Sequence, residues 1–381
     1  MSEVKRVLIV GAGIAGLSAS IALGQVGLEV ELIEIQPEPS TDGTGIQQPV
    51  NAIRAFAALG VLDELRAQGW RLHHSAFYDQ QGNLISRIVH SEDDHLSGNG
   101  ILRPRLHRIL VNAALARGVS LRTRLTIEQL HSHDRAAEVA FSDGTEGSYD
   151  LVVGADGINS KVRNLVFGPE PAPRFTGEMV WRCNLPRLPG LDGVHIYTTI
   201  GGRAGLIPSN DEVMYIFLIE PPVDGETRIA QERLAETFRV HLASYGGDIA
   251  TVRDTSLTAP DPPIIHRPLE TLMLSPSWYR GRVVIIGDAA HAMTPHLGQG
   301  AAQAVEDGLV LSRLLVRREG PLEPILREFM ARRHDRCKLA LEGSLQIGQW
   351  ELERRTDADF VGVATRVQRV TAEPFFDDLK A

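Results

Sequence analysis

The stretch Arg6–Glu34, RVLIVGAGIAGLSASIALGQVGLEVELIE, decides the fold class of this chain. It opens with an apolar run, Arg6–Val10, that ends at a glycine and predicts a short buried strand. Helical spacing of Leu17 and Ile21 follows, and Leu28–Glu34 predicts a second strand. The stretch is therefore a strand–helix–strand unit, which indicates an α/β protein with a parallel sheet.

The turn between the first strand and the helix has the pattern G-x-G-x-x-G. Gly11 permits the tight turn, Gly13 lets the backbone approach a pyrophosphate, and Gly16 lets helix and strand pack closely. The free backbone N–H groups at the N-terminus of the helix can bind phosphate, so Ile14 and Ala15 are also predicted to bind the cofactor. The pattern predicts that a dinucleotide binds here.

An acidic residue stands at the end of the second strand, 18 residues after Gly16. This residue, Glu34, is placed to accept hydrogen bonds from ribose hydroxyls. A carboxylate there repels a 2′-phosphate, which favours FAD or NAD over NADP. The motif alone does not choose between FAD and NAD.

Composition excludes several other classes of protein. The 381 residues carry 39 Lys+Arg and 48 Asp+Glu, a formal net charge of −9, with no basic run for nucleic acid. Cys183 and Cys337 are far apart, which argues against structural zinc and a secreted scaffold. The uncharged stretch Val7–Leu28 is broken by glycines and serines, so no membrane contact is expected and the cytoplasm is the expected location.

Two further segments complete a pattern that the first motif begins. They are GADGINSKVR at Gly154–Arg163 and GDAAHAMTPHLGQG at Gly287–Gly300. Because all three motifs occur in this order and at this spacing, the chain resembles the group A flavoprotein monooxygenases, the aromatic hydroxylases typified by para-hydroxybenzoate hydroxylase. The resemblance covers residues 5 to about 335. It is greatest to the small hydroxylases of urate, salicylate-like and heteroaromatic substrates.

The resemblance implies a discontinuous Rossmann-type FAD-binding domain with an inserted, mainly antiparallel β-sheet substrate domain and C-terminal helices. The expected FAD-binding parts are residues 1–72, 99–174 and 269–330. The expected substrate-domain parts are 73–98 and 175–268, followed by a helical segment, 331–381.

The same resemblance implies non-covalent FAD, with NADH or NADPH as co-substrate and O2 reacting through a flavin C4a-hydroperoxide. Besides the first motif and Glu34, the implied cofactor-binding residues are Arg103, Leu125, Asp156, Gly157, Asp288, Pro295, Gly298, Gln299, Gly300 and Ala301. The chain departs from the family pattern at three positions: Ala302 replaces the usual asparagine, Gly308 the usual alanine, and His296 the usual phenylalanine, aspartate or asparagine.

Three residues are catalytic candidates for hydroxylating a small, hydroxylated and anionic aromatic or heteroaromatic ring. His296 precedes the G-Q-G turn and could accept a proton from a substrate hydroxyl above the flavin. By the resemblance, Arg203 and Tyr215 flank the substrate. Arg203, between glycine and apolar strand residues, is expected to meet an anion there or else to be a surface charge.

Other readings stay open at this point. No metal site is expected, because His73 and His74 are adjacent and no carboxylate cluster accompanies them. A flavin prenyl reductase, a halogenase, or a protein that holds FAD without catalysis are the alternative functions. A homodimer is possible from the sequence, and the ring substrate is not identified.

Overall fold

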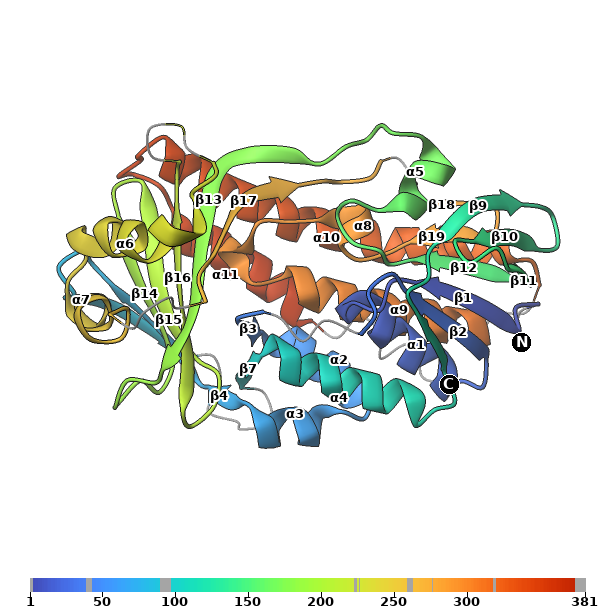
Figure 1. Cartoon of the computed structure of the whole chain (residues 1–381), viewed down its shortest axis with the longest axis horizontal. Helices are drawn as coiled ribbons and strands as arrows, with labels where there is room; N and C mark the ends of the chain where they lie inside the picture. Colours follow the sequence, from blue (N-terminus) through green and yellow to red (C-terminus); the bar gives the residue numbers. More distant parts are fainter. Residues whose placement is uncertain are drawn as a thin grey trace.

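Two β-sheets stand at opposite ends of the molecule, as Figure 1 shows for the computed structural model of the chain. The structure describes residues 3–38, 43–89, 97–222, 225, 227–258, 263–275, 277–317 and 320–373. Helices and connecting strands join the two sheets, and the opposed faces leave a hollow between them.

The first sheet has six strands and contains the dinucleotide-binding motif. Its order is β18 (Tyr279–Arg280), β19 (Val283–Ile285), β12 (Leu151–Gly154), β1 (Arg6–Val10), β2 (Glu29–Glu34) and β8 (Ser120–Thr123). All pairings are parallel except that of β18 with β19. Helices α1 (Ile14–Gln25) and α9 (Gly300–Arg317) pack against each other beside this sheet, with their apolar side chains in the largest core.

Two glycines of the motif are required by sterics rather than by ligand contact. A Cβ on Gly16 would lie 1.9 Å from the carbonyl oxygen of Gly11, so no other residue allows α1 to start this close to β1. Gly11 has φ +102° and passes so near Ala155 that a Cβ would lie 2.5 Å from the Ala155 oxygen. The chain thus crosses the carboxyl ends of β1 and β12 with no side chain in between.

The second sheet has seven strands and forms the wall opposite the motif. Its order is β17 (Ile265–Thr271), β13 (Arg174–Pro186), β16 (Val213–Glu220), β15 (Gly202–Pro208), β14 (Val194–Thr199), β5 (His74–Tyr78) and β6 (Leu84–Val89). Only β14 and β5 pair in parallel. The outer face is covered by α6 (Gln231–His241) and α7 (Gly247–Thr255), and the Trp181 ring stacks on Phe238 at 5.2 Å.

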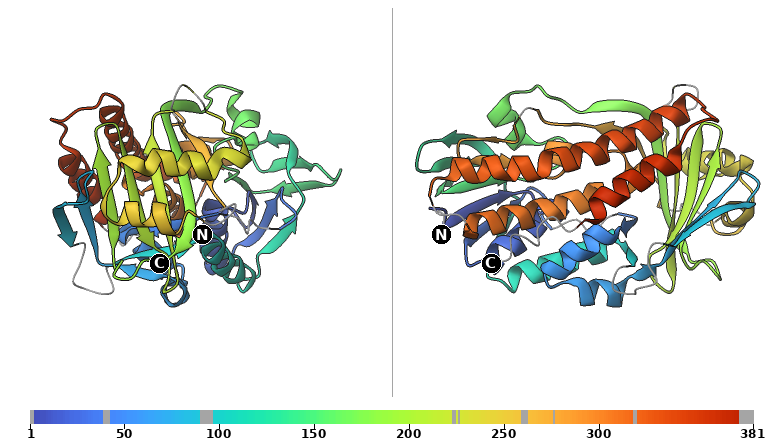
Figure 2. Two further views of the ribbon diagram at one scale, coloured as in Figure 1. Left: turned by 60° about the vertical axis from the view of Figure 1, so that its left-hand side comes forward. Right: turned by 180° about the vertical axis from the view of Figure 1, so that it is seen from behind.

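One long helix connects the two ends of the molecule. Helix α10 (Leu322–Leu352) has 31 residues and is therefore about 46 Å long. It packs on α9 at the first sheet and on β13 at the second, beside α11 (Phe360–Ala372), as Figure 2 shows from behind. A side chain late in α10 can therefore reach the inner face of the seven-stranded sheet.

Smaller elements complete the structure. Helices α2 (Val50–Ala58), α3 (Leu62–Gln68) and α4 (Arg103–Leu115) surround a three-stranded sheet of β3 (Gly45–Gln48), β7 (Gly98–Leu102) and β4 (Trp70–Leu72). A second three-stranded sheet contains β11 (Glu146–Tyr149), β10 (Ala137–Phe141) and β9 (Ile127–Ser132). The remaining helices are α5 (Lys161–Phe167), α8 (Asp288–His291) and the 3-10 turns η3 (Leu242–Ser244) and η4 (Pro295–Leu297).

The expected fold class is confirmed, with a Rossmann-type sheet, a mainly antiparallel second sheet and C-terminal helices. The glycine-rich and polar stretches 41–50 and 91–100 predict loops, and this prediction is partly wrong, because residues 45–48 and 98–102 pair with each other as β3 and β7. Residues 41, 42 and 91–96 of those loops lie outside the described residues. Within the described part of the chain, no helix is both long enough and apolar enough to cross a bilayer.

Candidate active site

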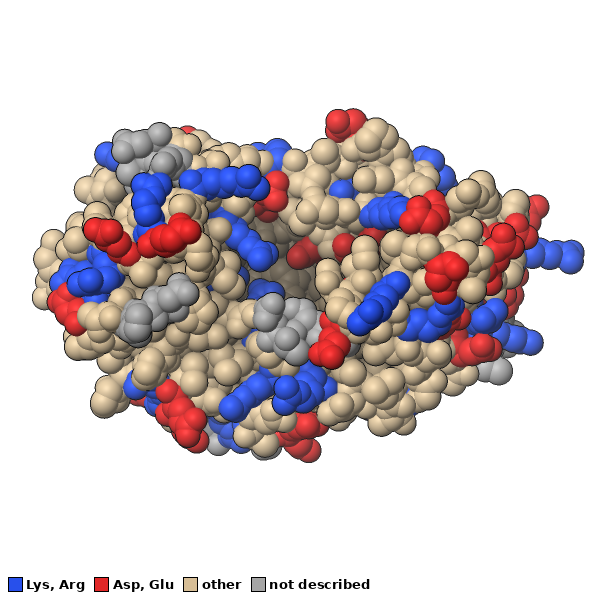
Figure 3. Space-filling model, viewed as in Figure 1, with Lys and Arg blue, Asp and Glu red and all other residues tan. Residues whose placement is uncertain are grey.

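A cavity of about 650 Å³ lies between the two sheets, and Figure 3 shows it as the hollow near the centre of the molecule. Fourteen of the residues expected from sequence line it. They are Gly13, Ile14, Ala15, Arg103, Gly157, Arg203, Tyr215, Asp288, Pro295, His296, Gly298, Gln299, Gly300 and Ala301. The three segments that carry the family resemblance therefore meet at one site.

At the motif end, the cavity is open to the backbone of the first α1 turn. A Cβ built on Gly13 meets no atom within 4 Å, so the backbone of this glycine borders open space. The Glu34 carboxylate lies behind this turn and accepts hydrogen bonds from the backbone N–H of Ala12 (2.8 Å) and of Gln36 (2.9 Å). These contacts fix the carboxylate beside the glycine turn.

Five expected cofactor-binding residues do not line the cavity, namely Gly11, Gly16, Glu34, Leu125 and Asp156. Leu125 is buried, and its backbone N–H donates to the Glu34 carbonyl oxygen at 2.9 Å. The Asp156 carboxylate accepts hydrogen bonds from Ser160 Oγ (2.5 Å) and the Val162 N–H (3.0 Å) at the start of α5. In this structure it shapes the turn that presents Gly157 to the cavity.

An aspartate and an arginine that attract each other, Asp288 and Arg103, both line the cavity. Asp288 begins α8, directly after β19, and Arg103 begins α4, directly after β7. Burial lowers the pKa of Arg103 and raises that of Asp288, while their mutual attraction opposes both effects. The pair can hold a polar, hydroxyl-bearing chain between the two ends of the cavity.

The N-terminus of α9 points into the cavity beside Asp288. Gly298 has φ +65°, in the left-handed region, and Gly300 starts the helix. The buried Gln299 side chain is held by Asn51 and Gln303, with Asn51 Nδ2 3.1 Å from Gln299 Oε1. Ala302 is fully buried in the core and does not line the cavity. A helix N-terminus favours negative charge, so this end suits an anionic ring system.

Together these features fit FAD. The glycine turn supplies backbone donors for a pyrophosphate, Glu34 lies beside it, and the α9 N-terminus supplies a positive dipole some distance further along the same cavity. The fit rests on the space left open at Gly13 and on the polar groups that border the cavity.

His296 does not present its ring to open space, contrary to the expectation from sequence. Its side chain is 0% exposed and is enclosed by two carboxylates. Nε2 lies 3.4 Å from Glu178 Oε1 and 3.3 Å from Glu351 Oε2, while Nδ1 lies 3.0 Å from Thr294 Oγ1. Burial disfavours the charged ring, but the nearby Glu178 and Glu351 carboxylates outweigh burial and raise the pKa of His296.

Arg203 was expected to meet a substrate anion or else to be a surface charge, but in the structure its anionic partner is Glu351 of the same chain. Its Nε donates to Glu351 Oε1 at 2.6 Å, and Nη2 contacts the same oxygen. The Arg203 and Glu351 side chains are 9% and 5% exposed, so the pair is buried. Glu351 comes from the last turn of α10, 148 residues away in sequence, so no local pattern around Arg203 indicates this partner.

Two arginines that the sequence analysis missed face the cavity near Tyr215. They are Arg182 on β13 and Arg267 on β17. Burial, with the like charges of Arg103 and Arg267, lowers the pKa of Arg182 to about 10. Alternation along β13 was the available signal, since Trp181 and Cys183 are core residues and Arg182 must face the other way.

Burial also raises the pKa of Tyr215, to about 12. Its hydroxyl therefore stays protonated at neutral pH and can donate a hydrogen bond. On the same strand Phe217 lines the cavity, whereas Trp181 and Tyr197 are core residues.

A buried network lies behind α9 and includes His291, which has a carboxylate partner there. His291 Nε2 is 2.7 Å from Asp307 Oδ2, and both side chains are 0% exposed. Arg333 of α10 contacts Asp307 Oδ1 and Glu306 Oε2, each at 2.7 Å. Burial disfavours the charged ring, but Cys337 and the Asp307 carboxylate raise the pKa of His291 well above its usual value. The network ties α8, α9 and α10 together beneath the cavity.

Comparisons with known proteins show the family to which the chain belongs. The family model described as FAD binding domain matches residues 5–343. The chain is 36% identical over 357 residues to 2-heptyl-3-hydroxy-4(1H)-quinolone synthase of Pseudomonas aeruginosa, covering 91% of this chain and 90% of that protein. It is 33% identical over 315 residues to the putative FAD-dependent monooxygenase YetM of Bacillus subtilis, covering 82% and 84%.

Among solved structures, HpxO of Klebsiella pneumoniae, complexed with FAD and uric acid, superposes with a TM-score of 0.83 at 24% identity. The superposition covers 98% of this chain and 94% of that one, and it shows the shared fold. The chain belongs to the FAD-binding domain family and is an FAD-dependent monooxygenase.

Proposed function

We propose that this enzyme uses NADH or NADPH and O2 to hydroxylate a planar heteroaromatic ring that carries an acidic hydroxyl or oxo group and an apolar substituent. The observation that carries the proposal is that cationic side chains stand on an otherwise apolar wall at the end of the cavity formed by the seven-stranded sheet. Bound FAD supplies the chemistry of taking electrons from the nicotinamide and transferring one oxygen atom from O2.

The flavin is assigned to the end of the cavity near the first sheet. We assign its pyrophosphate to the amides around Gly13, its ribose to Glu34, its ribityl chain to Asp288 and Arg103, and its ring to the α9 N-terminus at Gly300. Each group matches the charge of the part it would hold: N–H donors for phosphate, carboxylates for hydroxyls and a helix dipole for the anionic reduced ring.

The substrate is assigned to the end formed by the seven-stranded sheet. Inward-facing apolar side chains on that wall include Phe77, Val180, Val194, Ile196, Ile207, Phe217 and Ile219. Such a wall favours an aromatic ring with an apolar substituent. The quinolone and urate relatives named above act on or bind heteroaromatic molecules, which supports this class.

Arg182 and Arg267 are assigned the contact with the acidic oxygen of the substrate. Arg182 remains cationic at neutral pH with a pKa of about 10, and the neighbouring cations Arg103 and Arg267 destabilise it. An anionic oxygen would relieve that repulsion. Asp288 is the one carboxylate among the described lining residues, so it does not neutralise Arg103, Arg182 and Arg267 together. Tyr215, held protonated, can donate a hydrogen bond to a ring oxygen.

Arg203 and His296 are assigned a positioning role behind this wall. Their contacts with Glu178 and Glu351 fix the segment Thr294–Leu297 against α10. That segment leads into Gly298, so the network sets where the α9 N-terminus lies. This assignment replaces direct substrate binding by Arg203 and proton abstraction by His296.

The test is a panel of substrates with the FAD-loaded enzyme. Hydroxyquinolones, hydroxypyridines and urate are offered separately, and NADH or NADPH consumption is compared with hydrogen peroxide release. We expect one ring class to accelerate oxidation while peroxide release falls. A halogenase would need halide for turnover, a prenyl reductase would not respond to these rings, and an FAD-holding protein would not oxidise the nicotinamide; any of these results overturns the proposal.

A further inference from the structure

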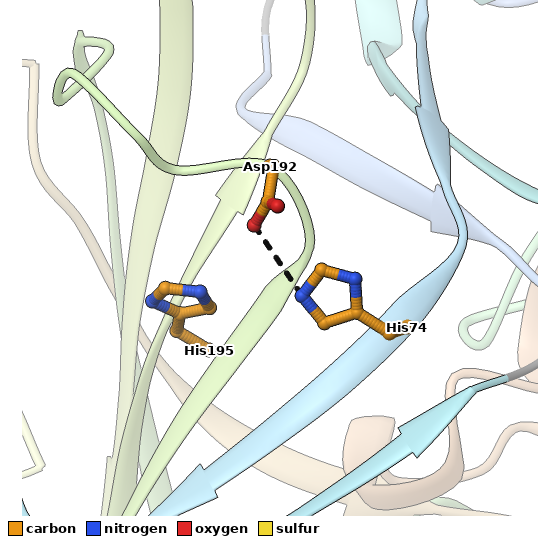
Figure 4. Close-up of side chains that lie close together, drawn as sticks. All are labelled: His74, Asp192 and His195. Atoms are coloured by element: carbon orange, nitrogen blue, oxygen red, sulfur yellow. Dashed lines mark ion pairs between the residues drawn. The ribbon is translucent and has the colours of Figure 1, made fainter.

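Two histidines and an aspartate come together on the outer face of the seven-stranded sheet, away from the cavity (Figure 4). They are His74 at the start of β5, Asp192 in the loop before β14, and His195 on β14. Strand alternation separates them from the active site, because Ser75, Val194 and Ile196 line the cavity. The expectation that no carboxylate accompanies His74 was therefore wrong.

The two imidazoles are buried but incompletely bonded. His74 is 7% exposed and His195 6% exposed, and neither Nε2 atom has a hydrogen-bond partner among the residues that the structure describes. His74 Nε2 lies 3.3 Å from Asp192 Oδ1, without hydrogen-bond geometry. Figure 4 shows both rings turning a nitrogen toward the Asp192 side. Buried ring nitrogens without partners cost stability unless a ligand meets them.

The proton on His195 is placed by a fourth residue. Nδ1 of His195 lies 3.1 Å from Asp248 Oδ2, on α7. This hydrogen bond lowers the pKa of Asp248, so the carboxylate is ionised and can only accept. Nδ1 therefore donates this hydrogen bond, which leaves Nε2 as the nitrogen available to a ligand. A metal-binding histidine is commonly oriented in this way by a carboxylate on its other nitrogen.

His74 is also held in the form that binds metals. Burial lowers its pKa, although Asp192 opposes this effect, so the ring is neutral at physiological pH. A Cβ on Gly193 would lie 2.6 Å from His74 Nε2, so the glycine keeps the approach to that nitrogen clear. Asp192 is 56% exposed, which leaves a route for an ion from solvent.

We propose that His74, Asp192 and His195 form a Zn²⁺ site, with water completing the coordination. Two donors on one tetrahedral zinc lie about 3.3 Å apart, since each bond is roughly 2.0–2.1 Å, and the His74–Asp192 distance already equals this. All three donor atoms lie within 4.8 Å of one another, so small side-chain rotations bring in the third. Arg87, 3.9 Å from Asp192 and half-exposed, is the cation that zinc would displace.

The ion would fasten the loop before β14 to β5 and, through Asp248, to α7. Because β5 and β14 carry cavity-lining residues on their other face, zinc would brace one wall of the substrate end. The proposal does not depend on which substrate the enzyme takes, since the site is on the other face of the sheet.

The test uses tag-free, FAD-loaded full-length protein, stripped with a chelator and equilibrated with zinc chloride. Zinc per chain is measured by mass spectrometry after desalting, together with the melting temperature. The parent should retain one zinc per chain and melt at a higher temperature with zinc than without it. Asp192→Asn should lose the zinc and the temperature rise, while FAD content and metal-free melting stay unchanged because Asp192 is exposed.

Three further variants make the result specific. Asp248→Asn should weaken zinc binding by about 10- to 100-fold, as loss of an orienting partner does. His133→Asn alters a matched but exposed histidine–carboxylate pair, with His133 3.4 Å from Glu138, and should leave zinc content unchanged. His296→Gln disrupts the Glu178–His296–Glu351 cluster and should also retain zinc. The proposal is overturned if the parent retains no zinc, if Asp192→Asn retains it, or if His296→Gln loses it.

Discussion

Replacing Arg203 by alanine should destabilise the protein strongly, because the substitution leaves Glu351 buried without its cation. Glu351 is 5% exposed and Glu178, which shares His296 with it, is 2% exposed. Removing one partner of a buried pair costs about 3–5 kcal/mol. With an unfolding entropy of about 2.1 cal/mol/K per residue over 381 residues, roughly 0.8 kcal/mol/K, the melting temperature should fall by about 4–6 °C.

A double-mutant cycle separates ion pairing from substrate contact. Thermal unfolding of FAD-loaded protein is followed for Arg203→Met, Glu351→Leu and the double variant. The double variant should melt above the Arg203→Met variant, since removing both charges leaves no carboxylate uncompensated. Additive losses, or an unchanged melting temperature in Arg203→Ala, would refute the assignment. Unchanged stability with less product per NADH would instead favour the original hypothesis that Arg203 anchors the substrate.

Four other perturbations have clear expected outcomes. Gly16→Ala should abolish FAD binding or folding, because its Cβ would lie 1.9 Å from the Gly11 oxygen; retained flavin in the absorbance spectrum would contradict this. Glu34→Lys should weaken FAD binding, measured by fluorescence titration, since it also removes the acceptor for the Ala12 N–H. Arg182→Gln should raise the substrate KM more than 10-fold with FAD content unchanged, whereas a solvent-facing control at Arg87 should not. The pKa of His296 is raised in the folded protein, so protonation of this ring stabilises the fold below pH 6.5, and this stabilisation is lost as the pH rises through the pKa of the folded state. The melting temperature of the His296→Gln variant should therefore lack this fall with rising pH.

Local patterns were sufficient to predict much of the fold. The strand Arg6–Val10 and the helix Arg103–Leu115 have the bounds that their apolar periodicity indicates. Apolar runs beside glycines also located β12 and β19. By contrast, Gly45–Gln48 is polar and glycine-containing, and it is a strand only because β7 pairs with it across the chain. Nothing in its own residues predicts that partner.

The site was predicted where it follows from backbone geometry and was missed where it depends on distant side chains. Gly13, Asp288 and Gly300 lie at strand ends or helix starts, and these positions meet at one edge of a parallel sheet. Arg203 and His296 line the cavity, but their surroundings depend on Glu351, which α10 brings from the far end of the chain. Sequence spacing has no information about such a contact.

The central claim is that one oxygen atom from O2 enters a heteroaromatic ring at this site. The most direct measurement is a turnover of the FAD-loaded enzyme with NAD(P)H and the ring that stimulates oxidation, under ¹⁸O2, followed by mass spectrometry of the product. The account predicts that the product gains one ¹⁸O atom and that Arg182→Gln yields less of it per nicotinamide consumed. A product whose new oxygen comes from water, or nicotinamide oxidation that yields only labelled hydrogen peroxide with every ring tested, would contradict it.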